Sequence, residues 1–230
     1  MAAREFKAIF FDLDGTLVDI HGPLYLAAKK ALDDLGVNPP LTRERYWESI
    51  SADETMLGVP ENRRRDFAKL ACAYFITEID ATERMEVLPH VPETLAELKR
   101  RGYATGVITS RPGDAQRLVE KLAMVGLAAH LDHVVTQDTA TLRALDKSES
   151  LRETAKRAEV TPDACVYVGD EPRDIMAASN AGFGAAVAVA TGPATYEHLL
   201  SHPEYRPHWV MRSMSELFFV LEKLKAEAME

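Results

Sequence analysis

Short apolar runs alternate with stretches of helical periodicity over most of the chain. The runs predict buried strands, because a strand covered on both faces is apolar throughout. They are Ala8–Phe11, Tyr103–Ile108, His133–Thr136, Ala164–Val168, Ala185–Ala190 and a short last candidate, His208–Met211. The stretches between and after them predict helices at Pro92–Arg101, Asp114–Met124, Glu149–Ala158 and Arg173–Asn180, and from a capping box at Ser213–Glu216 through roughly Glu227. Strands that alternate with helices predict an α/β protein with a doubly wound parallel sheet.

The segment from 19 to 86 has a different pattern, mostly helical and without a convincing strand. Its spacing predicts helices over Leu24–Gly36 and from about Thr42, and a capping box at Ser51–Glu54 predicts a short third helix. Pro60 suits the first position of the longest periodic stretch. No second strand follows the first until residue 103. We therefore predict a core domain of residues 1–18 and 87–230, with a small all-helical cap domain, residues 19–86, inserted after the first strand.

Two carboxylates stand at the end of the first apolar run, in Asp12-Leu13-Asp14-Gly15-Thr16. Residues two apart in extended chain point to the same side, so both carboxylates share a face while Leu13 points away. Gly15 lets the backbone turn sharply after them. Neighbouring carboxylates repel each other unless a cation or a raised pKa relieves them. A strand that simply ends in an acidic turn is the alternative interpretation of this pattern. The functional interpretation is a site at which the two carboxylates take part in chemistry.

Polar side chains also follow the later strands, and ligands of parallel sheets bind beyond the carboxyl ends of the strands. In Thr109–Pro112 a hydroxyl can bind a phosphate oxygen and the turn can offer backbone N–H groups, although a helix-capping turn would look alike. Asp170 and Asp174 are four apart, so both could face the site across the first turn of a helix. Their alternative role is a favourable interaction with the helix dipole.

A hard cation such as Mg²⁺ takes one or two carboxylates together with substrate phosphate and water. We predict Asp12 and Asp170 as its side-chain ligands, with Asp174 one layer further out. Lys147, in a polar loop, is the candidate cation for neutralising a transferring phosphoryl group and keeping a nucleophile ionised. A solvated surface lysine is its alternative role, and Arg143 is the fallback for the cation.

Composition narrows the class of protein without naming a function. The 230 residues are 47% hydrophobic and 27% charged, which is typical of a soluble globular protein. A formal charge of −9 disfavours nucleic-acid and anionic-membrane surfaces. The two cysteines, Cys72 and Cys165, have no metal-ligand spacing and predict a reduced, cytoplasmic setting. We see no signal-peptide pattern and no run long enough for a membrane span.

The strand-end motifs, in their order, resemble those of the haloacid dehalogenase-like hydrolase superfamily. The matching features are DxDGT after the first strand, Thr109 after the second, a loop lysine at Lys147 and a GDxxxD motif at Asp170 and Asp174. The family commonly has Pro after its lysine, where this chain has Ser148. The resemblance covers essentially all of the chain outside the helical insert, and it implies a Rossmann-like core. The insert looks like the small cap of the phosphoglycolate phosphatase-like group.

The resemblance also implies a role for each motif residue. Asp12 would attack phosphorus and form an aspartyl-phosphate, and Asp14 would protonate the leaving oxygen and then activate water. Thr109 and Lys147 would contact the phosphoryl oxygens, with Ser110 and Arg111 beside them in the substrate site. The Asp14 backbone carbonyl would join Asp12 and Asp170 as a Mg²⁺ ligand. Dehalogenases of the family do not carry the acid/base Asp14, so the chain resembles the phosphoryl-transfer branches.

The expected reaction is therefore Mg²⁺-dependent hydrolysis of a small phosphate ester, phosphoglycolate-like or a sugar phosphate. A phosphomutase is the alternative, and a non-catalytic binding protein on this fold is the third hypothesis. Three consecutive cap arginines, Arg63–Arg65, indicate a solvated helix face or a site for a substrate carboxylate or second phosphate. His21 is a loop residue or a substrate contact. We expect a monomer or homodimer, with no nucleic-acid or membrane partner.

Overall fold

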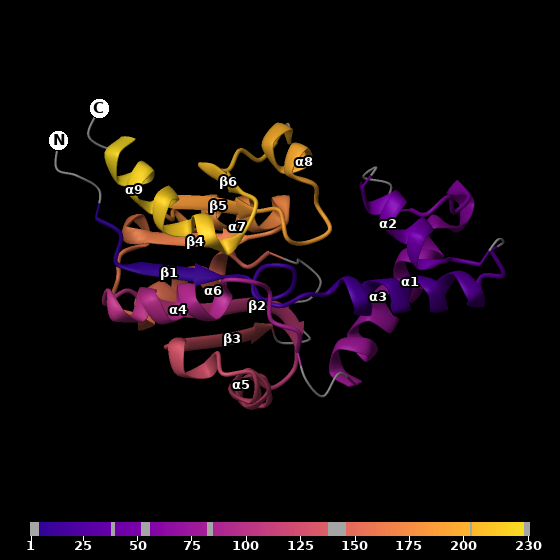
Figure 1. Ribbon diagram of the computed structural model, residues 1–230, viewed down its shortest axis with the longest axis horizontal. Coiled ribbons are helices and arrows are strands. Elements are labelled where there is room, and N and C mark those ends of the chain that lie inside the picture. The colour runs from indigo at the N-terminus through magenta and orange to yellow at the C-terminus, as the bar shows by residue number, and fades with distance from the viewer. Residues whose placement is uncertain are drawn as a thin grey trace.

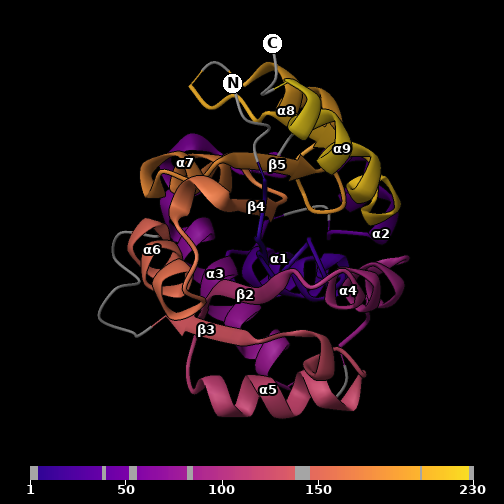
Figure 2. The same cartoon turned by 90° about the vertical axis from the view of Figure 1, so that its left-hand side faces the viewer.

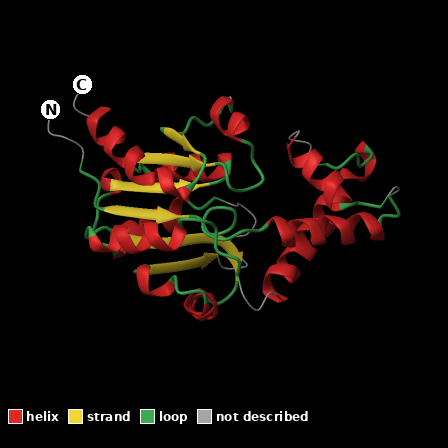
Figure 3. Ribbon diagram, viewed as in Figure 1, coloured by secondary structure: helices red, strands yellow, loops and turns green. Residues whose placement is uncertain are grey.

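A six-stranded parallel sheet forms the centre of the computed structural model, which describes residues 5–37, 40–51, 56–81, 85–137, 146–202 and 204–227. The strands lie in the order β3-β2-β1-β4-β5-β6, and every neighbouring pair is parallel (Figures 1 and 3). They are β1 (Ala8–Phe11), β2 (Ala104–Pro112), β3 (His133–Gln137), β4 (Cys165–Gly169), β5 (Ala185–Val189) and β6 (Trp209–Met211). The predicted doubly wound α/β fold is confirmed.

Helices cover both faces of the sheet, and alternate residues of each strand point to opposite faces, so both sets of side chains are buried. Ile9 and Phe11 of β1 pack on one side, among side chains of α4 (Val91–Arg100), α5 (Ala115–Met124) and α9 (Leu217–Glu227). Ala8 and Phe10 pack on the other, with α6 (Ser148–Arg157), α7 (Pro172–Ala181) and α8 (Tyr196–Ser201). Figure 2 shows α4 and α9 on one side of the strands and α6 and α7 on the other.

Three helices form a separate lobe beyond the carboxyl ends of the central strands (Figure 1). They are α1 (His21–Asp34), α2 (Arg43–Ser51) and α3 (Arg64–Ala81), the last preceded by a 3₁₀ turn at Glu61–Arg63. This helical lobe has its own hydrophobic cluster, in which Leu32, Tyr46 and Phe67 are buried. An independent cluster of this kind supports the predicted cap domain of residues 19–86, whose boundaries remain a prediction.

The two connections to the helical lobe run side by side in opposite directions. Val18 and Val87 form an antiparallel bridge, the Asp19 N–H donates to the Glu86 carbonyl at 2.8 Å, and the Leu88 N–H donates to the Leu17 carbonyl at 3.0 Å. The chain therefore leaves and re-enters the core at one place. This arrangement holds the lobe over the edge of the sheet where the candidate site lies.

The predicted elements differ from the structure mainly at their ends. β2 does not stop at Ile108 but continues, after a register shift, to Pro112. α8 was not predicted, and the segment after Ser213 first forms a 3₁₀ turn at Met214–Glu216 before α9 begins. Further 3₁₀ turns lie at Ala128–His130 and Pro162–Ala164. The predicted short helix at Ser51–Glu54 falls, after Ser51, outside the described residues.

Candidate active site

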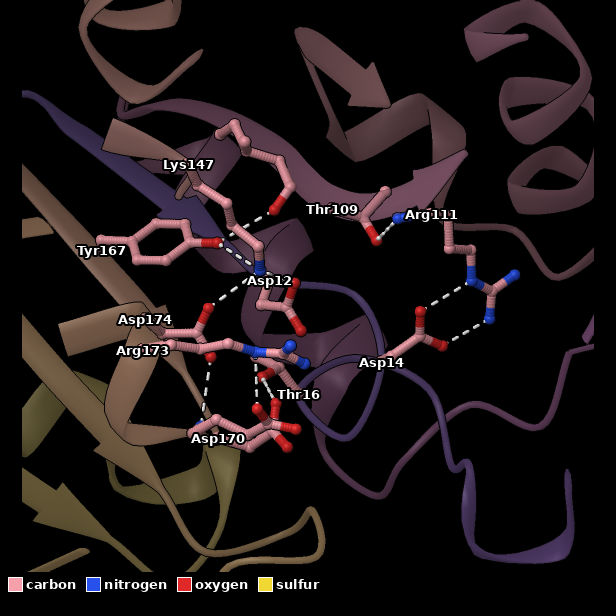
Figure 4. A network of polar contacts seen from close by, with 12 residues as sticks. Asp12, Asp14, Thr16, Thr109, Arg111, Lys147, Tyr167, Asp170, Arg173 and Asp174 are labelled. Atoms are coloured by element: carbon pink, nitrogen blue, oxygen red, sulfur yellow. Dashed lines mark hydrogen bonds and ion pairs between the residues drawn. The ribbon is translucent and has the colours of Figure 1, made fainter. Parts of the chain in front are cut away.

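Neighbouring strands bring the predicted residues to one edge of the sheet. Phe11 of β1 is in register with Val107 of β2 and Val168 of β4, and the Asp12 N–H donates to the Val168 carbonyl at 2.8 Å. The residues just beyond these positions include Asp12, Thr109 and Asp170, all of which are buried. Figure 4 shows them grouped around the side chain of Lys147.

Lys147 is the centre of a buried polar network and is only 2% exposed. Its ammonium group donates to a carboxylate oxygen of Asp12, to Asp174 Oδ1 at 2.8 Å and to the Tyr167 hydroxyl at 3.3 Å (Figure 4). The Tyr167 hydroxyl in turn donates to the Ile108 carbonyl at 2.9 Å. The cation is thus fully paired, and the network fixes the Asp12 carboxylate relative to Asp174.

Local hydrogen bonds place Lys147 at the start of α6. The N–H and the hydroxyl of Ser148 donate to the two carboxylate oxygens of Asp146, at 2.8 and 2.9 Å. Ser148 therefore uses a backbone donor that the proline common in the family lacks. The structure thus brings Lys147 into the site despite the departure from the motif, while its fallback Arg143 lies outside the described residues.

The carboxylate of Asp170 lies between two backbone segments that leave no room for a side chain. A Cβ on Gly192 would come within 1.8 Å of Asp170 Oδ2, and one on Gly15, whose φ is +81°, within 2.4 Å. The Thr16 hydroxyl donates to Asp170 Oδ1 at 2.9 Å, but Oδ2 is buried with no hydrogen-bond partner among the described atoms. An unsatisfied buried carboxylate oxygen marks a position suited to a cation.

The donor set at this position fits Mg²⁺. Asp12, Asp170 and Asp174 each offer an oxygen within 4.8 Å of the others. Asp174, however, accepts from Lys147 through one oxygen and from the Glu171 N–H, at 3.1 Å, through the other, as part of the capping box of α7. Asp12 and Asp170 therefore remain the residues that would hold the ion, and Asp174 would orient the groups around it.

Burial of the cluster shifts its ionisation. It raises the pKa of Asp12 to about 7, with Lys147 acting in the opposite direction and Asp174 and Asp14 in the same one. Burial together with the charges of Asp12 and Asp174 holds the pKa of Asp170 well above its usual range. Burial alone would lower the pKa of Lys147, but Asp12 and Asp174 outweigh it and raise that pKa well above normal. A divalent cation would favour the ionised carboxylates.

Asp14 and Arg111 form a bidentate ion pair at the cavity wall. Arg111 donates to the two carboxylate oxygens of Asp14 at 2.7 and 2.5 Å (Figure 4). The Arg111 N–H donates to the Thr109 hydroxyl oxygen at 3.1 Å, while the buried Ser110 hydroxyl has no partner among the described residues. All four residues line the same cavity as Asp12 and Lys147. The structure thus brings together every predicted substrate-site residue, with Arg111 paired to Asp14.

A cavity of about 400 Å³ lies between the helical lobe and the edge of the sheet around Asp12, Thr109 and Lys147, which is the candidate catalytic edge. The arginine run Arg63–Arg65 and His21, which the sequence offered as possible substrate contacts in the lobe, do not line this cavity. Arg63 donates to the Leu35 carbonyl at 2.5 Å, Arg64 to the Val59 carbonyl at 3.3 Å, and Arg65 is exposed. The His21 ring packs against Trp47 in a tilted arrangement, with ring centroids 4.7 Å apart. Neither His21 nor these arginines belong to the described residues that line the cavity.

Sequence reasoning missed several residues that shape the site. The Thr191 hydroxyl donates to the Gly15 carbonyl at 2.6 Å and so fixes the loop after β5, with Gly192, against the DxDGT turn. The sequence alone does not predict the contact of the Thr16 hydroxyl with Asp170 or those of Tyr167 with Lys147 and the Ile108 carbonyl. The signal for Tyr167 is a hydroxyl-bearing ring inside an otherwise apolar strand, because a buried phenol needs a hydrogen-bond partner. Nothing local in the sequence indicates the roles of Thr191 and Gly192.

Fold and site together define an α/β enzyme that works at a carboxylate-rich strand edge beneath a helical lobe. A family model described as haloacid dehalogenase-like hydrolase matches residues 9–188, and the chain belongs to this family. A pyrophosphatase of Bacillus velezensis is 30% identical, covering 96% of this chain and 98% of its own. A phosphoglycolate phosphatase of Synechococcus elongatus is 29% identical, covering 95% and 98%. The chain is thus a phosphatase of this family, of the phosphoglycolate phosphatase-like group, as its motifs predicted.

Solved structures share the fold. A haloacid dehalogenase-like family hydrolase from Streptococcus pneumoniae superposes with a TM-score of 0.68 at 20% identity, covering 94% of this chain and 98% of its own. Separately, no helix in the described part of the chain has the length and apolar character needed to cross a bilayer.

Proposed function

We propose that the protein is a Mg²⁺-dependent phosphatase that hydrolyses a small phosphate monoester through an aspartyl-phosphate on Asp12. The observation that carries the proposal is the orphaned Oδ2 of Asp170 beside the Asp12 carboxylate, which Lys147 holds at the end of the cavity. An isolated cluster of buried acids would be costly. A cation held by Asp12 and Asp170, with a phosphoryl group bound within reach of Asp12 and Lys147, accounts for the whole arrangement.

The chain's own residues supply each step. Asp12 attacks phosphorus as the bond to the leaving oxygen breaks, and Asp14 gives that oxygen its proton. Asp14 then takes a proton from water, which attacks the aspartyl-phosphate, releases phosphate and restores Asp12. Thr109, Ser110 and Lys147 donate to the phosphoryl oxygens as charge spreads over them. Mg²⁺ held by Asp12, Asp170 and the Asp14 carbonyl would offset the repulsion between nucleophile and phosphoryl group.

Asp14 can act only when its pair with Arg111 loosens. In the structure both Asp14 oxygens accept from Arg111. We infer that a bound phosphoryl group attracts the Arg111 guanidinium, because the two carry opposite charge, and thereby frees Asp14 to face the leaving oxygen. Arg111 would then contribute to substrate binding, as expected from the sequence.

Hydrolysis is favoured over the phosphomutase alternative. A mutase needs a base on its cap to manage a bisphosphate intermediate. The helical-lobe residues described around the cavity include no His, Lys, Asp or Glu. Transfer to water is therefore the reaction that this lobe supports.

The test measures phosphate release from a panel of phosphate monoesters, with Mg²⁺ or with chelator, for wild type, Asp12→Asn and the exposed control Asp163→Asn. We expect Mg²⁺-dependent release that Asp12→Asn abolishes and Asp163→Asn retains. Acid-quenched wild type should carry one phosphoryl group on the peptide that contains Asp12. Release that persists in Asp12→Asn would refute the mechanism, and isomerised product without net phosphate would establish the mutase.

A further inference from the structure

The cavity has two ends of opposite character. At the core end stand the catalytic edge and the charged side chains of Arg111, Lys147 and Arg173. At the lobe end the wall is built mainly of hydrocarbon from α1, α2, α3 and the turn at Leu57, including Leu24, Tyr46, Phe67, Phe75 and Ile76. Because the phosphoryl group must sit beside Asp12, the lobe end is the only side of this cavity left for the leaving group.

The described residues of the lobe end offer no positively charged side chain to a second anionic group of a substrate. Every cation described around the cavity comes from the core, and in the ligand-free structure each faces a carboxylate: Lys147 with Asp12 and Asp174, Arg111 with Asp14, and Arg173 with Glu171 at 2.6 Å. When Arg111 leaves Asp14 in the proposed mechanism, the phosphoryl group takes it up, so it does not serve a second anionic group. The helical-lobe residues around the cavity contribute no charged side chain among those described. A carboxylate in the leaving group would therefore be desolvated without a partner, close to several acids.

Hydrogen bonds are also scarce at the lobe end. The polar side-chain groups that the described lobe residues bring to the wall are the Tyr46 hydroxyl and the thiol of Cys72. The Tyr46 hydroxyl is buried and has no hydrogen-bond partner in the described structure. The many hydroxyls of a sugar would lose their water here without replacement, whereas a single polar group could pair with Tyr46. A volume of about 400 Å³ lies at the lower end of ordinary ligand pockets, roughly 300–1,000 Å³.

We propose that the physiological leaving group is apolar: the substrate is a phosphate monoester of an alkyl or aromatic alcohol carrying at most one further hydrogen-bonding group. This inference rests on the proposed phosphatase function and narrows its substrate class. It departs from the phosphoglycolate-like or sugar-phosphate substrate expected from the family resemblance. The difference arises in the helical lobe, while the catalytic edge keeps the family's residues.

The first test compares kcat/KM for n-hexyl phosphate and phenyl phosphate with kcat/KM for 2-phosphoglycolate and glucose 6-phosphate. A hydrophobic pocket gains about tenfold or more for each methylene it buries, and a charged group without a partner is rejected. We expect the apolar esters to be preferred by at least about 100-fold. Asp12-dependent, Mg²⁺-dependent hydrolysis with the opposite preference would overturn this inference while leaving the proposed function intact.

A matched pair of variants asks whether the lobe end sets the preference. Ala71 lines the cavity from α3, whereas Ala73 is exposed on the same helix and is not part of the wall. Ala71→Lys places a cation at the lobe end and should lower the hexyl phosphate to phosphoglycolate ratio by at least about tenfold, while Ala73→Lys leaves it unchanged. A ratio that is the same in both variants would contradict the assignment of the leaving-group site.

Cys72 provides a measurement that needs no turnover. It is exposed and lines the lobe end, whereas Cys165 is buried, with its pKa raised by burial to about 12. Hexylphosphonate and phosphonoacetate cannot be hydrolysed at their C–P bonds. We expect hexylphosphonate with Mg²⁺ to slow alkylation of Cys72 several-fold and phosphonoacetate at the same concentration to leave it unchanged. Equal protection, or stronger protection by phosphonoacetate, would overturn the inference even in a protein that released no phosphate from any ester.

Discussion

The two ends of the cavity are built on different principles. At the core end the side chains project from strand ends and from the start of α6, and Lys147 alone contacts Asp12, Asp174 and Tyr167. At the lobe end the wall is made of apolar side chains from helices that pack on one another around their own cluster. The core end is therefore a network of charged groups held in place by hydrogen bonds, and the lobe end is an apolar wall.

This difference assigns the type of reaction to one end of the cavity and the choice of substrate to the other. The core end determines that a phosphoryl group is bound and transferred, because its charges match that group and little else. In the proposed function the lobe end selects the leaving alcohol, because its lining fixes which groups can be desolvated beside the site. Substitutions at the core end should change both stability and catalysis strongly, whereas those at the lobe end should change selectivity with small effects on stability.

Removing the central cation should break the core end most severely. Lys147→Met leaves Asp12 and Asp174 buried without their partner, and breaking a buried ion pair from one side costs about 3–5 kcal/mol. We expect the free energy of unfolding to fall by that amount, with a drop in Tm of about 10 °C, and kcat/KM to fall at least about 100-fold. Chemical denaturation and phosphate release measure the two effects.

The matched control for this variant is Lys156→Met. Lys156 lies on the same helix, α6, and is exposed. It should change stability by less than about 0.5 kcal/mol and leave activity unchanged. If Lys147→Met behaved like Lys156→Met, Lys147 would not be the residue that holds the buried carboxylates of the core end in place.

Metal binding and pH should act on the core end together. Without metal, the pKa of Asp12 in the folded state is about 7, against an ordinary value of 3.8, so between these pH values the folded protein binds more protons than the unfolded one. The contribution of Asp12 to the stability of the metal-free protein therefore falls as pH rises through this window. Mg²⁺ should restore it by favouring the ionised carboxylates. At about 100 times its Kd the ion adds about 2.7 kcal/mol, or about 5–10 °C in Tm.

Thermal unfolding with Mg²⁺ or with chelator, at about pH 5 and about pH 8, tests this sign. The Mg²⁺-induced rise in Tm should be clearly larger at the higher pH, where protons no longer compete with the ion. Potassium chloride at equal ionic strength should not reproduce it. A rise of equal size at both pH values would show that these carboxylates do not bind the ion.

A smaller effect should follow from filling the space beside Asp170. In Gly192→Ala the new Cβ would lie 1.8 Å from Asp170 Oδ2, so the loop or the carboxylate must move, at a cost of about 1–3 kcal/mol. Mg²⁺ should bind more weakly, while KM for the ester, which depends on the lobe end, should change less than kcat. Gly22→Ala in α1 is the control, because a Cβ there meets nothing within 4 Å. Equal metal affinity in the two variants would refute the role assigned to Gly192.

The sequence predicts the core end better than the lobe end, for a physical reason. Asp12, Thr109 and Asp170 follow apolar runs, and parallel strands bring their carboxyl ends together whatever the details of packing. Their convergence could therefore be predicted from local patterns. The ion pair between Asp14 and Arg111 could not, because it depends on the unpredicted continuation of β2 past Ile108.

The lobe end depends on contacts between helices that no local pattern specifies. The helical periodicity of α3 predicts an apolar face but not what that face contacts, and part of the face lines the cavity rather than a core. Arg63–Arg65 illustrate the same limit, since their charge left both a solvated helix face and a substrate site open. In the structure Arg63 donates to the Leu35 carbonyl, Arg64 donates to the Val59 carbonyl, and Arg65 is exposed. Composition alone cannot distinguish a wall of a cavity from a packed interface.

The smallest predicted effect concerns the Tyr46 phenol at the lobe end. Burial, with the charge of Asp19, raises the pKa of Tyr46 to about 12, and its hydroxyl has no partner in the described structure. Tyr46→Phe removes an unsatisfied polar atom and keeps the ring, so the ligand-free protein should gain about 1 kcal/mol of stability, or about 2–4 °C in Tm. Tyr74→Phe is the control: the Tyr74 hydroxyl donates to Asp34, and its loss should bring no gain. A loss of stability in Tyr46→Phe would mean that the hydroxyl already has a hydrogen-bond partner and that the lobe end is more polar than its lining residues indicate.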